Sequence, residues 1–177
     1  MHLLWMSGST LKSFGVIIAF LLPGFIATWG LSYHSGLVST WLAGCEASST
    51  SVGGVALAML LALGCGLIAS TVRWMAIDTL HHRTGIQKRD WDFRQLQPSI
   101  GAYQILEENH YRFYQFYGNS LCALVFTILC GKLDAPMNWG QQDIVMFLVA
   151  VVLFLGSRDC LGKYYKRVDD LMDRSET

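Results

Sequence analysis

Five side chains that can bind a metal ion or transfer protons lie at two places in the middle of the sequence. Asp78 lies three and four residues before His81 and His82, so an α-helix would bring all three to one face. Glu107 and His110 are three residues apart, a spacing that carboxylate-bridged metal sites use in helical bundles. Together they could ligate one ion, which would suit a metal-dependent membrane enzyme that acts on a lipid or a quinone.

The small number of histidines argues against this metal site. Membrane enzymes with histidine boxes need more histidines than the five in this chain, and His34 is expected on the other side of the membrane. A solvated cluster of weakly interacting polar side chains is the favoured interpretation. The metal-dependent enzyme is kept as the alternative, and no cofactor is expected.

Aromatic and basic side chains form a second group, in and before the segment YRFYQFYGN at 111–119. Tyrosine and tryptophan are enriched where helices leave the lipid, so an interfacial belt is the simplest interpretation. Their place beside the membrane would also suit a lipid headgroup or a cytoplasmic protein partner. The residues expected to form this surface are Arg89, Trp91, Arg94, Arg112, Tyr114, Tyr117 and Asn119.

The composition indicates what kind of elements must position these residues. Of the 177 residues, 53% are hydrophobic and 15% are charged, against roughly 25% charged in a soluble domain. Thirteen basic side chains balance thirteen acidic ones, so there is no net field to attract nucleic acid, and no such partner is expected. The five cysteines are irregularly spaced and predict small buried side chains rather than disulfides or a zinc site.

Long apolar segments predict an all-α, polytopic membrane protein of one domain, with the lipid bilayer as its first partner. A helix needs about 20 residues to cross ~30 Å of hydrocarbon. The expected spans are about 12–33, 52–73, 113–131 and 143–161. Residues 74–112 are expected to be a cytoplasmic segment, and residues 162–174 a cytoplasmic helix.

The third and fourth helices are expected to continue into the cytoplasm as an antiparallel hairpin. An apolar and aromatic stripe at helical spacing follows Pro98, with the members Tyr103, Leu106, His110, Phe113, Tyr114 and Tyr117. The opposite face is expected to carry Glu107, Glu108, Arg112 and Gln115. A matching stripe follows the fourth span, with the members Leu161, Tyr165, Val168 and Met172.

The distribution of basic residues predicts the orientation. Eleven of the thirteen Lys and Arg lie after the second span or in the C-terminal tail, and Lys12 precedes the first span. Lys132 alone lies in the connections on the other side. The positive-inside rule then places both termini in the cytoplasm, with a bacterial inner membrane as the expected location.

Small residues recur every four positions along the second span. Such a stripe lets another helix backbone approach closely, which is how helices pack in lipid. The partner could be another helix of the same chain, which is the simpler interpretation, or a second subunit. The members of the stripe are Gly54, Ala58, Ala62, Gly66 and Ser70.

The middle of the first span contains Pro23 and Gly24. Proline has no amide to donate to the Ala19 carbonyl, so the helix can bend at this point. A fixed bend is the default interpretation, and a gating hinge at Pro23 and Gly24 is the alternative.

These features favour a non-enzymatic membrane protein. We expect a homo-oligomer that acts as a membrane anchor, a sensor or a pore-forming subunit for a cytoplasmic partner, for example in bacterial defence or stress. A passive channel and the metal-dependent enzyme are the alternatives. No charged residue lies in the middle of a span, which argues against an ion-coupled transporter.

Overall fold

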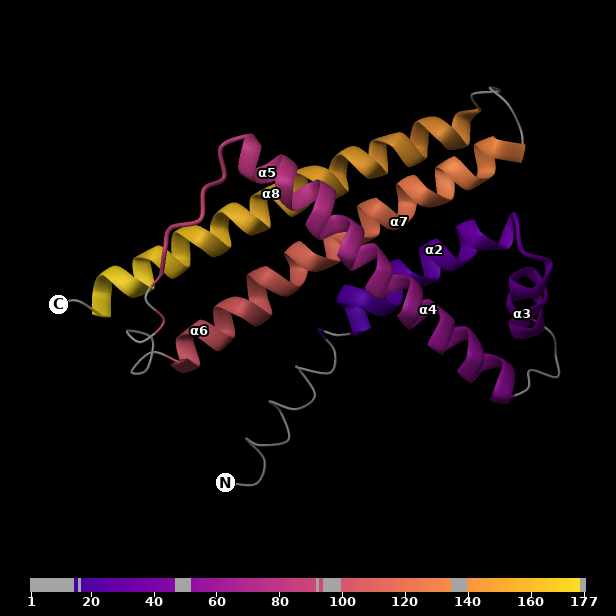
Figure 1. Cartoon of the computed structure of the whole chain (residues 1–177), viewed down its shortest axis with the longest axis horizontal. Helices are drawn as coiled ribbons and strands as arrows, with labels where there is room; N and C mark the ends of the chain where they lie inside the picture. Colours follow the sequence, from indigo (N-terminus) through magenta and orange to yellow (C-terminus); the bar gives the residue numbers. More distant parts are fainter. Residues whose placement is uncertain are drawn as a thin grey trace.

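The fold is an assembly of long helices, seen in a computed structural model of the chain (Figure 1). The structure describes residues 15, 17–46, 52–91, 93, 100–134 and 140–175. In chain order the elements are η1 (Ile17–Leu21), α2 (Leu22–Ser32), α3 (Gly36–Glu46), α4 (Val52–Arg73), η2 (Trp74–Asp78), α5 (Thr79–Arg83), α6 (Ile100–Leu106), η4 (Glu107–Tyr111), α7 (Arg112–Asp134) and α8 (Gln141–Ser175). The three η elements are π-helical turns, whose hydrogen bonds join residues five apart and not four.

The helices bear out the membrane class that the composition predicts. Three are long and apolar enough to cross a membrane: Val52–Arg83, Ile100–Leu133 and Gln141–Asp173. The apolar helix Ile17–Ser32 is shorter. Residues 12–14 and 16, which would complete the expected first span, lie outside the described residues, so a fourth crossing is not confirmed.

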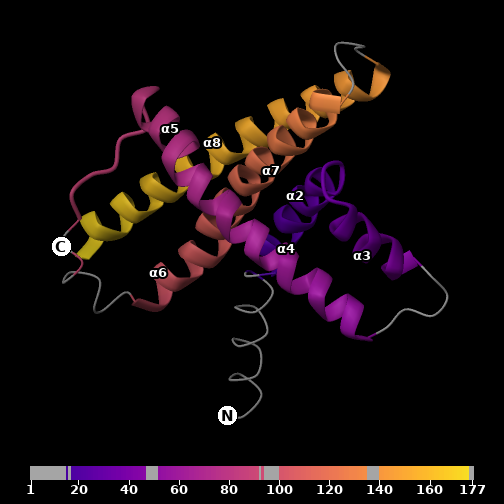
Figure 2. The ribbon, with the colours of Figure 1, turned by 45° about the vertical axis from the view of Figure 1, so that its right-hand side comes forward.

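Helix α7 lies at the centre of the assembly. It contacts α2, α4 and α8, while α2 also contacts α4. Figures 1 and 2 both show α7 and α8 side by side with opposite chain directions, and α4 crossing them obliquely. The short helix α3 lies at one end, against α2 and α4.

The outer faces of these helices are apolar. Leu60 and Ile68 on α4 are 65% and 66% exposed, and Val152 on α8 is 64% exposed. Soluble monomers rarely expose apolar surface on this scale, whereas a helix in hydrocarbon must. The exposed faces therefore mark the surface that contacts lipid.

The first helix and α4 cross in close backbone contact through two glycines. A Cβ atom at Gly24 would lie 1.7 Å from the carbonyl oxygen of Ala62, and one at Gly66 would lie 2.0 Å from that of Phe20. The small-residue stripe of α4 thus faces another helix of the same chain at Ala62 and Gly66. At Gly54, by contrast, an added Cβ would meet nothing within 4 Å.

The turn after α5 is fastened to α8. Gly85 has φ +101°, a left-handed conformation that glycine adopts without steric cost and that commonly follows the end of a helix. The guanidinium of Arg158 donates to the hydroxyl of Thr84 and, at 2.8 Å, to its carbonyl oxygen. Arg158 therefore ties the end of α5 to the middle of α8.

Gly66→Ala is expected to lower the thermal stability of the detergent-solubilised protein, because the new methyl group collides with the backbone at Phe20. Overpacking of this kind typically costs about 1–3 kcal/mol. The midpoint of thermal unfolding, followed by circular dichroism, measures the effect. Gly64→Ala is the matched control, since a Cβ there meets no atom within 4 Å. Equal midpoints for the two variants would contradict the close crossing.

Candidate functional site

A chain of buried, paired polar side chains lies where α4 ends. Arg73, the last residue of α4, is only 4% exposed. Its Nη1 donates to Oδ1 of Asp78 at 2.8 Å, and its Nε donates to Oδ1 of Asn119 at 3.0 Å. The guanidinium carbon lies 4.7 Å from the ring centre of Tyr114, whose hydroxyl also donates to Asp78. We call Arg73, Asp78, Tyr114 and Asn119 the polar chain.

The π-helical turn η2 explains why Arg73 and Asp78 meet. Residues five apart point in different directions on an α-helix, where ion pairs form between residues three or four apart. In the wider turn Trp74–Asp78 the hydrogen bonds span five residues, which brings the two side chains together. Gly118 on α7 leaves the room that they need, because a Cβ there would lie 2.5 Å from Cδ of Arg73.

Asn119 links the polar chain to the first helix. Its Nδ2 donates to the carbonyl oxygen of Ala19 at 2.7 Å. In an α-helix this carbonyl would accept from the amide of residue 23, but that residue is proline and has no N–H. The Asn119 side chain supplies the missing donor. Both Pro23 and Gly24 are buried, and Gly24 lies against the backbone of α4, so the structure places the candidate hinge beside a packed contact.

Two histidines of the α5 turn are held by α8. His81 is fully buried, and its Nε2 lies 3.1 Å from Oγ of Ser157. Its Nδ1 has no hydrogen-bond partner among the described residues. His82 is exposed, and its Nε2 lies 3.3 Å from the hydroxyl of Tyr165. The two imidazoles therefore face different partners.

The five candidate metal ligands are not brought together. Among the described residues, no group of three His, Cys, Asp or Glu side chains is placed to hold a metal ion. Asp78 is engaged by Arg73 and Tyr114, while His81 and His82 contact α8. Glu107 and His110 both lie in the π-helical turn Glu107–Tyr111. The α-helical geometry that the three-residue spacing assumes therefore does not hold for this pair.

The same turn changes which side chains of this region face inward. Phe113, expected on the apolar stripe, is 42% exposed, whereas Tyr111 packs against the buried core. Glu107 was expected on the opposite face, yet it lines a cavity together with Tyr103 and Tyr111. The stripe residues Tyr103, Leu106 and Tyr114 are buried or partly buried, as the pattern predicts. Glu107 lies four residues after Tyr103 and so shares its face on an ordinary helix, while the wide turn rotates only the residues that follow it, such as Phe113.

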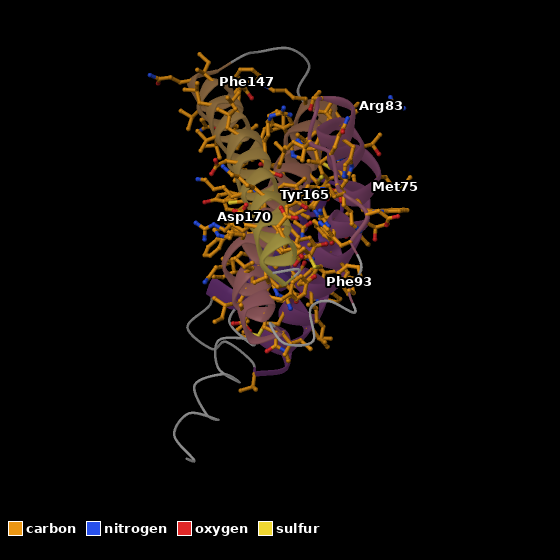
Figure 3. The ribbon with its side chains drawn as sticks, turned by 90° about the vertical axis from the view of Figure 1, so that its left-hand side faces the viewer. Met75, Arg83, Phe93, Phe147, Tyr165 and Asp170 are labelled. Atoms are coloured by element: carbon orange, nitrogen blue, oxygen red, sulfur yellow. The ribbon has the colours of Figure 1, made fainter. Side chains whose placement is uncertain are left out.

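An aromatic cluster joins α8 to α6 and η4. We call this part, residues 100–111 and 161–175, the stalk. Its buried core consists of Tyr164, Val168 and Met172. The partly buried residues around the core are Trp91, Tyr103, Leu106, Tyr111, Tyr165 and Leu171. Figure 3 shows Tyr165 on the side of α8 that faces α4 and α5, and Asp170 on the opposite side.

Comparisons with known proteins do not identify a family. No protein-family model, no curated protein and no solved structure matches the chain. The function is therefore inferred from the geometry of these sites alone.

The residues expected to receive a partner or a lipid headgroup do not form one surface. Tyr114 and Asn119 are buried in the polar chain, and Tyr117 packs against Gly156. Trp91 is half-buried and donates from Nε1 to Asp169 at 2.7 Å.

Only part of the expected surface is open to solvent. Arg89 is exposed and lies 3.6 Å from Asp173. Arg112 is half-buried, with its side chain against Gly15 and Gln115. Arg94 lies outside the described residues.

The polar chain is suited to holding helices together, because its ion pair joins a buried Arg73 to a half-buried Asp78 and is hydrogen-bonded on both sides. Removing one partner of such a pair leaves an uncompensated buried charge and costs about 3–5 kcal/mol. Arg73 and Ser157 were not singled out from the sequence. Two features of the sequence could have identified them. Arg73 is a single cation at the end of a long apolar segment, and Ser157 is a hydroxyl residue within another apolar segment.

Asn119→Leu is expected to destabilise the protein, and Pro23→Ala is expected to remove part of that loss. The leucine leaves the Ala19 carbonyl and the Arg73 Nε without their partner, at about 1–3 kcal/mol for each buried group. Alanine at position 23 returns an amide that can bond Ala19. Thermal midpoints of the wild type, both single variants and the double variant measure the coupling. Strictly additive effects would contradict the role assigned to Asn119.

Proposed function

We propose that this protein is a non-enzymatic anchor in a bacterial inner membrane that presents the stalk to a cytoplasmic protein partner. In this proposal the first helix completes a fourth crossing, and both termini and the stalk lie in the cytoplasm. The concentration of Lys and Arg after the second span and in the C-terminal tail supports this orientation.

The length of two helices supports a stalk that projects from the membrane as an antiparallel hairpin. Ile100–Leu133 contains 34 residues and Gln141–Asp173 contains 33. A crossing uses about 20 residues, so each helix has about 13 residues to spare, or ~20 Å at the α-helical rise. The aromatic core around Tyr164 and Val168 would keep these extensions packed in water.

One observation carries the proposal of a protein partner: the stalk exposes large apolar side chains where no lipid would cover them. Ile100 is 57% exposed and Ile105 is 59% exposed. Ile105 lines a shallow groove of about 370 Å³ whose other lining residues are Ala102, Leu106, Arg167, Asp170 and Leu171. An apolar patch rimmed by both charge signs is typical of a protein–protein contact.

The same geometry favours an anchor over a pore-forming subunit. Ala62 and Gly66 are used inside the chain, in contact with the first helix. Self-association remains part of the proposal, but it must use another lipid-facing surface. The polar side chains at the end of α4 pair with one another, as the Arg73–Asp78 ion pair shows, and do not offer a row of free groups to an ion.

A cysteine-reactive, membrane-impermeant label is expected to reach residue 90 only from the cytoplasmic side. The variant is Asp90→Cys, in a chain whose five cysteines are replaced by Ala. Labelling should require permeabilised cells or inverted vesicles, because the proposal places the 86–91 segment in the cytoplasm. Leu133→Cys, at the other end of α7 and 77% exposed, should be labelled in intact cells. The opposite pattern would refute the orientation.

A photo-crosslinking residue at position 170 is expected to form a covalent adduct with a partner protein in intact cells. Asp170 lines the groove, whereas Arg83 is exposed on the opposite side (Figure 3) and serves as the control position. Ile105→Asp should abolish the adduct, because it places a charge in the apolar part of the groove. Gln104→Asp, at an exposed neighbour that does not line the groove, should leave it intact.

The adduct is detected as a higher-mass band that contains this chain, after ultraviolet irradiation. No adduct at position 170 would refute a partner at this groove. The same adduct at position 83 would do so as well.

A further inference from the structure

The stalk lines a second cavity, of about 290 Å³ and open to the surface, on the side away from the groove. It lies between residues 86–91 and 93, α6 with η4, and α8. Its lining residues are Lys88, Trp91, Phe93, Tyr103, Glu107, Tyr111, Tyr164 and Tyr165. Figure 3 shows Tyr165 and Phe93 on the same side of α8, with Asp170 on the other. Aromatic side chains therefore make up most of the wall.

Trp91 and Phe93 meet their neighbours at steep angles, whereas Tyr164 lies at 43° to Tyr111 and at 49° to Tyr165. Trp91 lies edge-on to Tyr164 at 84° and to Tyr165 at 74°, with ring centres 6.3 Å and 5.5 Å apart. Phe93 meets Tyr103 at 80°. Edge-to-face arrangements of this kind are favourable for aromatic pairs.

The polar ends of several rings are already occupied. The hydroxyl groups of Tyr103 and Tyr164 lie 3.0 Å apart, and the Trp91 indole donates to Asp169. The hydroxyl of Tyr165 lies beside His82. These side chains therefore offer ring surface to an occupant more than they offer hydrogen bonds.

The wall carries one cationic and one acidic side chain, Lys88 and Glu107. Nζ of Lys88 lies 5.3 Å from the ring centre of Trp91, so an ammonium group already rests against the largest aromatic face. Glu107 is the only acidic lining residue, and among the described residues it has no ion-pair partner. A carboxylate and several ring faces together stabilise a positive charge.

We propose that this cavity binds a quaternary ammonium group. Aromatic walls suit a trimethylammonium cation, which interacts with ring faces and needs no hydrogen-bond acceptor. A metal ion would need several carboxylate or carbonyl ligands, and the wall supplies one carboxylate. The ligand displaces the Lys88 ammonium from Trp91 and places its charge near Glu107. This site is independent of the protein partner proposed for the groove.

Choline titrated into the full-length protein tests this assignment, with isothermal calorimetry as the measurement. The protein is held in nanodiscs of phosphatidylethanolamine and phosphatidylglycerol, which contain no quaternary ammonium group. Saturable binding of choline is expected. The uncharged analogue 3,3-dimethylbutan-1-ol has nearly the same shape and should bind at least about fivefold more weakly, because it lacks the cation–π attraction.

Substitutions in the wall are expected to act in opposite directions. Glu107→Gln should weaken choline binding by about two- to tenfold, and Lys88→Met should strengthen it, because Lys88 competes for the face of Trp91. Trp91→Leu should weaken binding by about 2- to 30-fold. Glu108→Gln and Lys163→Met are the controls: they remove the same charges outside the cavity and should leave binding unchanged. If Trp91→Leu does not fold, choline binding by Glu107→Gln and Lys88→Met tests the proposal.

A second set of nanodiscs, which contain phosphatidylcholine, distinguishes the two sources of such a group. Weaker apparent binding of free choline there would identify the lipid headgroup as the occupant, and unchanged binding would identify a soluble cation. Either result supports the site, provided that choline binds saturably in the first set of nanodiscs. No saturable binding in either nanodisc, equal binding of the uncharged analogue, or weaker binding by Lys88→Met would overturn the proposal.

Discussion

The centre of this protein is organised around one buried carbonyl group, that of Ala19, which needs a hydrogen-bond donor. Pro23 cannot donate to the Ala19 carbonyl, and Ala19 is fully buried, so the carbonyl needs a donor from within the protein. Asn119 of α7 donates to it, and the same amide group accepts from Arg73 of α4. Arg73 in turn pairs with Asp78. One proline thereby fixes how the first helix, α4 and α7 meet.

π-Helical turns recur where this network and the stalk are built. Among the described residues they occur just before Pro23, between Arg73 and Asp78, and at Glu107–Tyr111. Each turn adds width and rotates the following residues around the helix axis. The turn at η2 makes an ion pair between residues five apart, and the first and last residues of η4, Glu107 and Tyr111, line the aromatic cavity. These turns are often found at functional sites.

The two ends of the long helices are stabilised by different forces. Within the apolar lengths, close backbone contact holds the helices, as at Gly24 and Gly66, since lipid provides little hydrophobic driving force between them. In the stalk, Tyr164 and Val168 are buried among other aromatic and apolar side chains. The same helix α8 therefore exposes Val152 to lipid and buries Val168.

The sequence alone determined the solvent of this protein and the extent of its long helices. Apolar length and sparse charge are local properties, and they predict the helices around 52–73, 113–131 and 143–161, together with the continuation of the last two past their apolar segments. The continuation of the helix from Val52 to Arg83 was not predicted. Tertiary structure decided which polar residues meet. Asn119 and Ala19 are 100 residues apart, and the pairing of Arg73 with Asp78 depends on a π-helical turn that a three- and four-residue pattern does not contain. Contacts of this kind arise only when separate helices pack, so neither spacing nor composition could reveal the polar chain or the aromatic cavity.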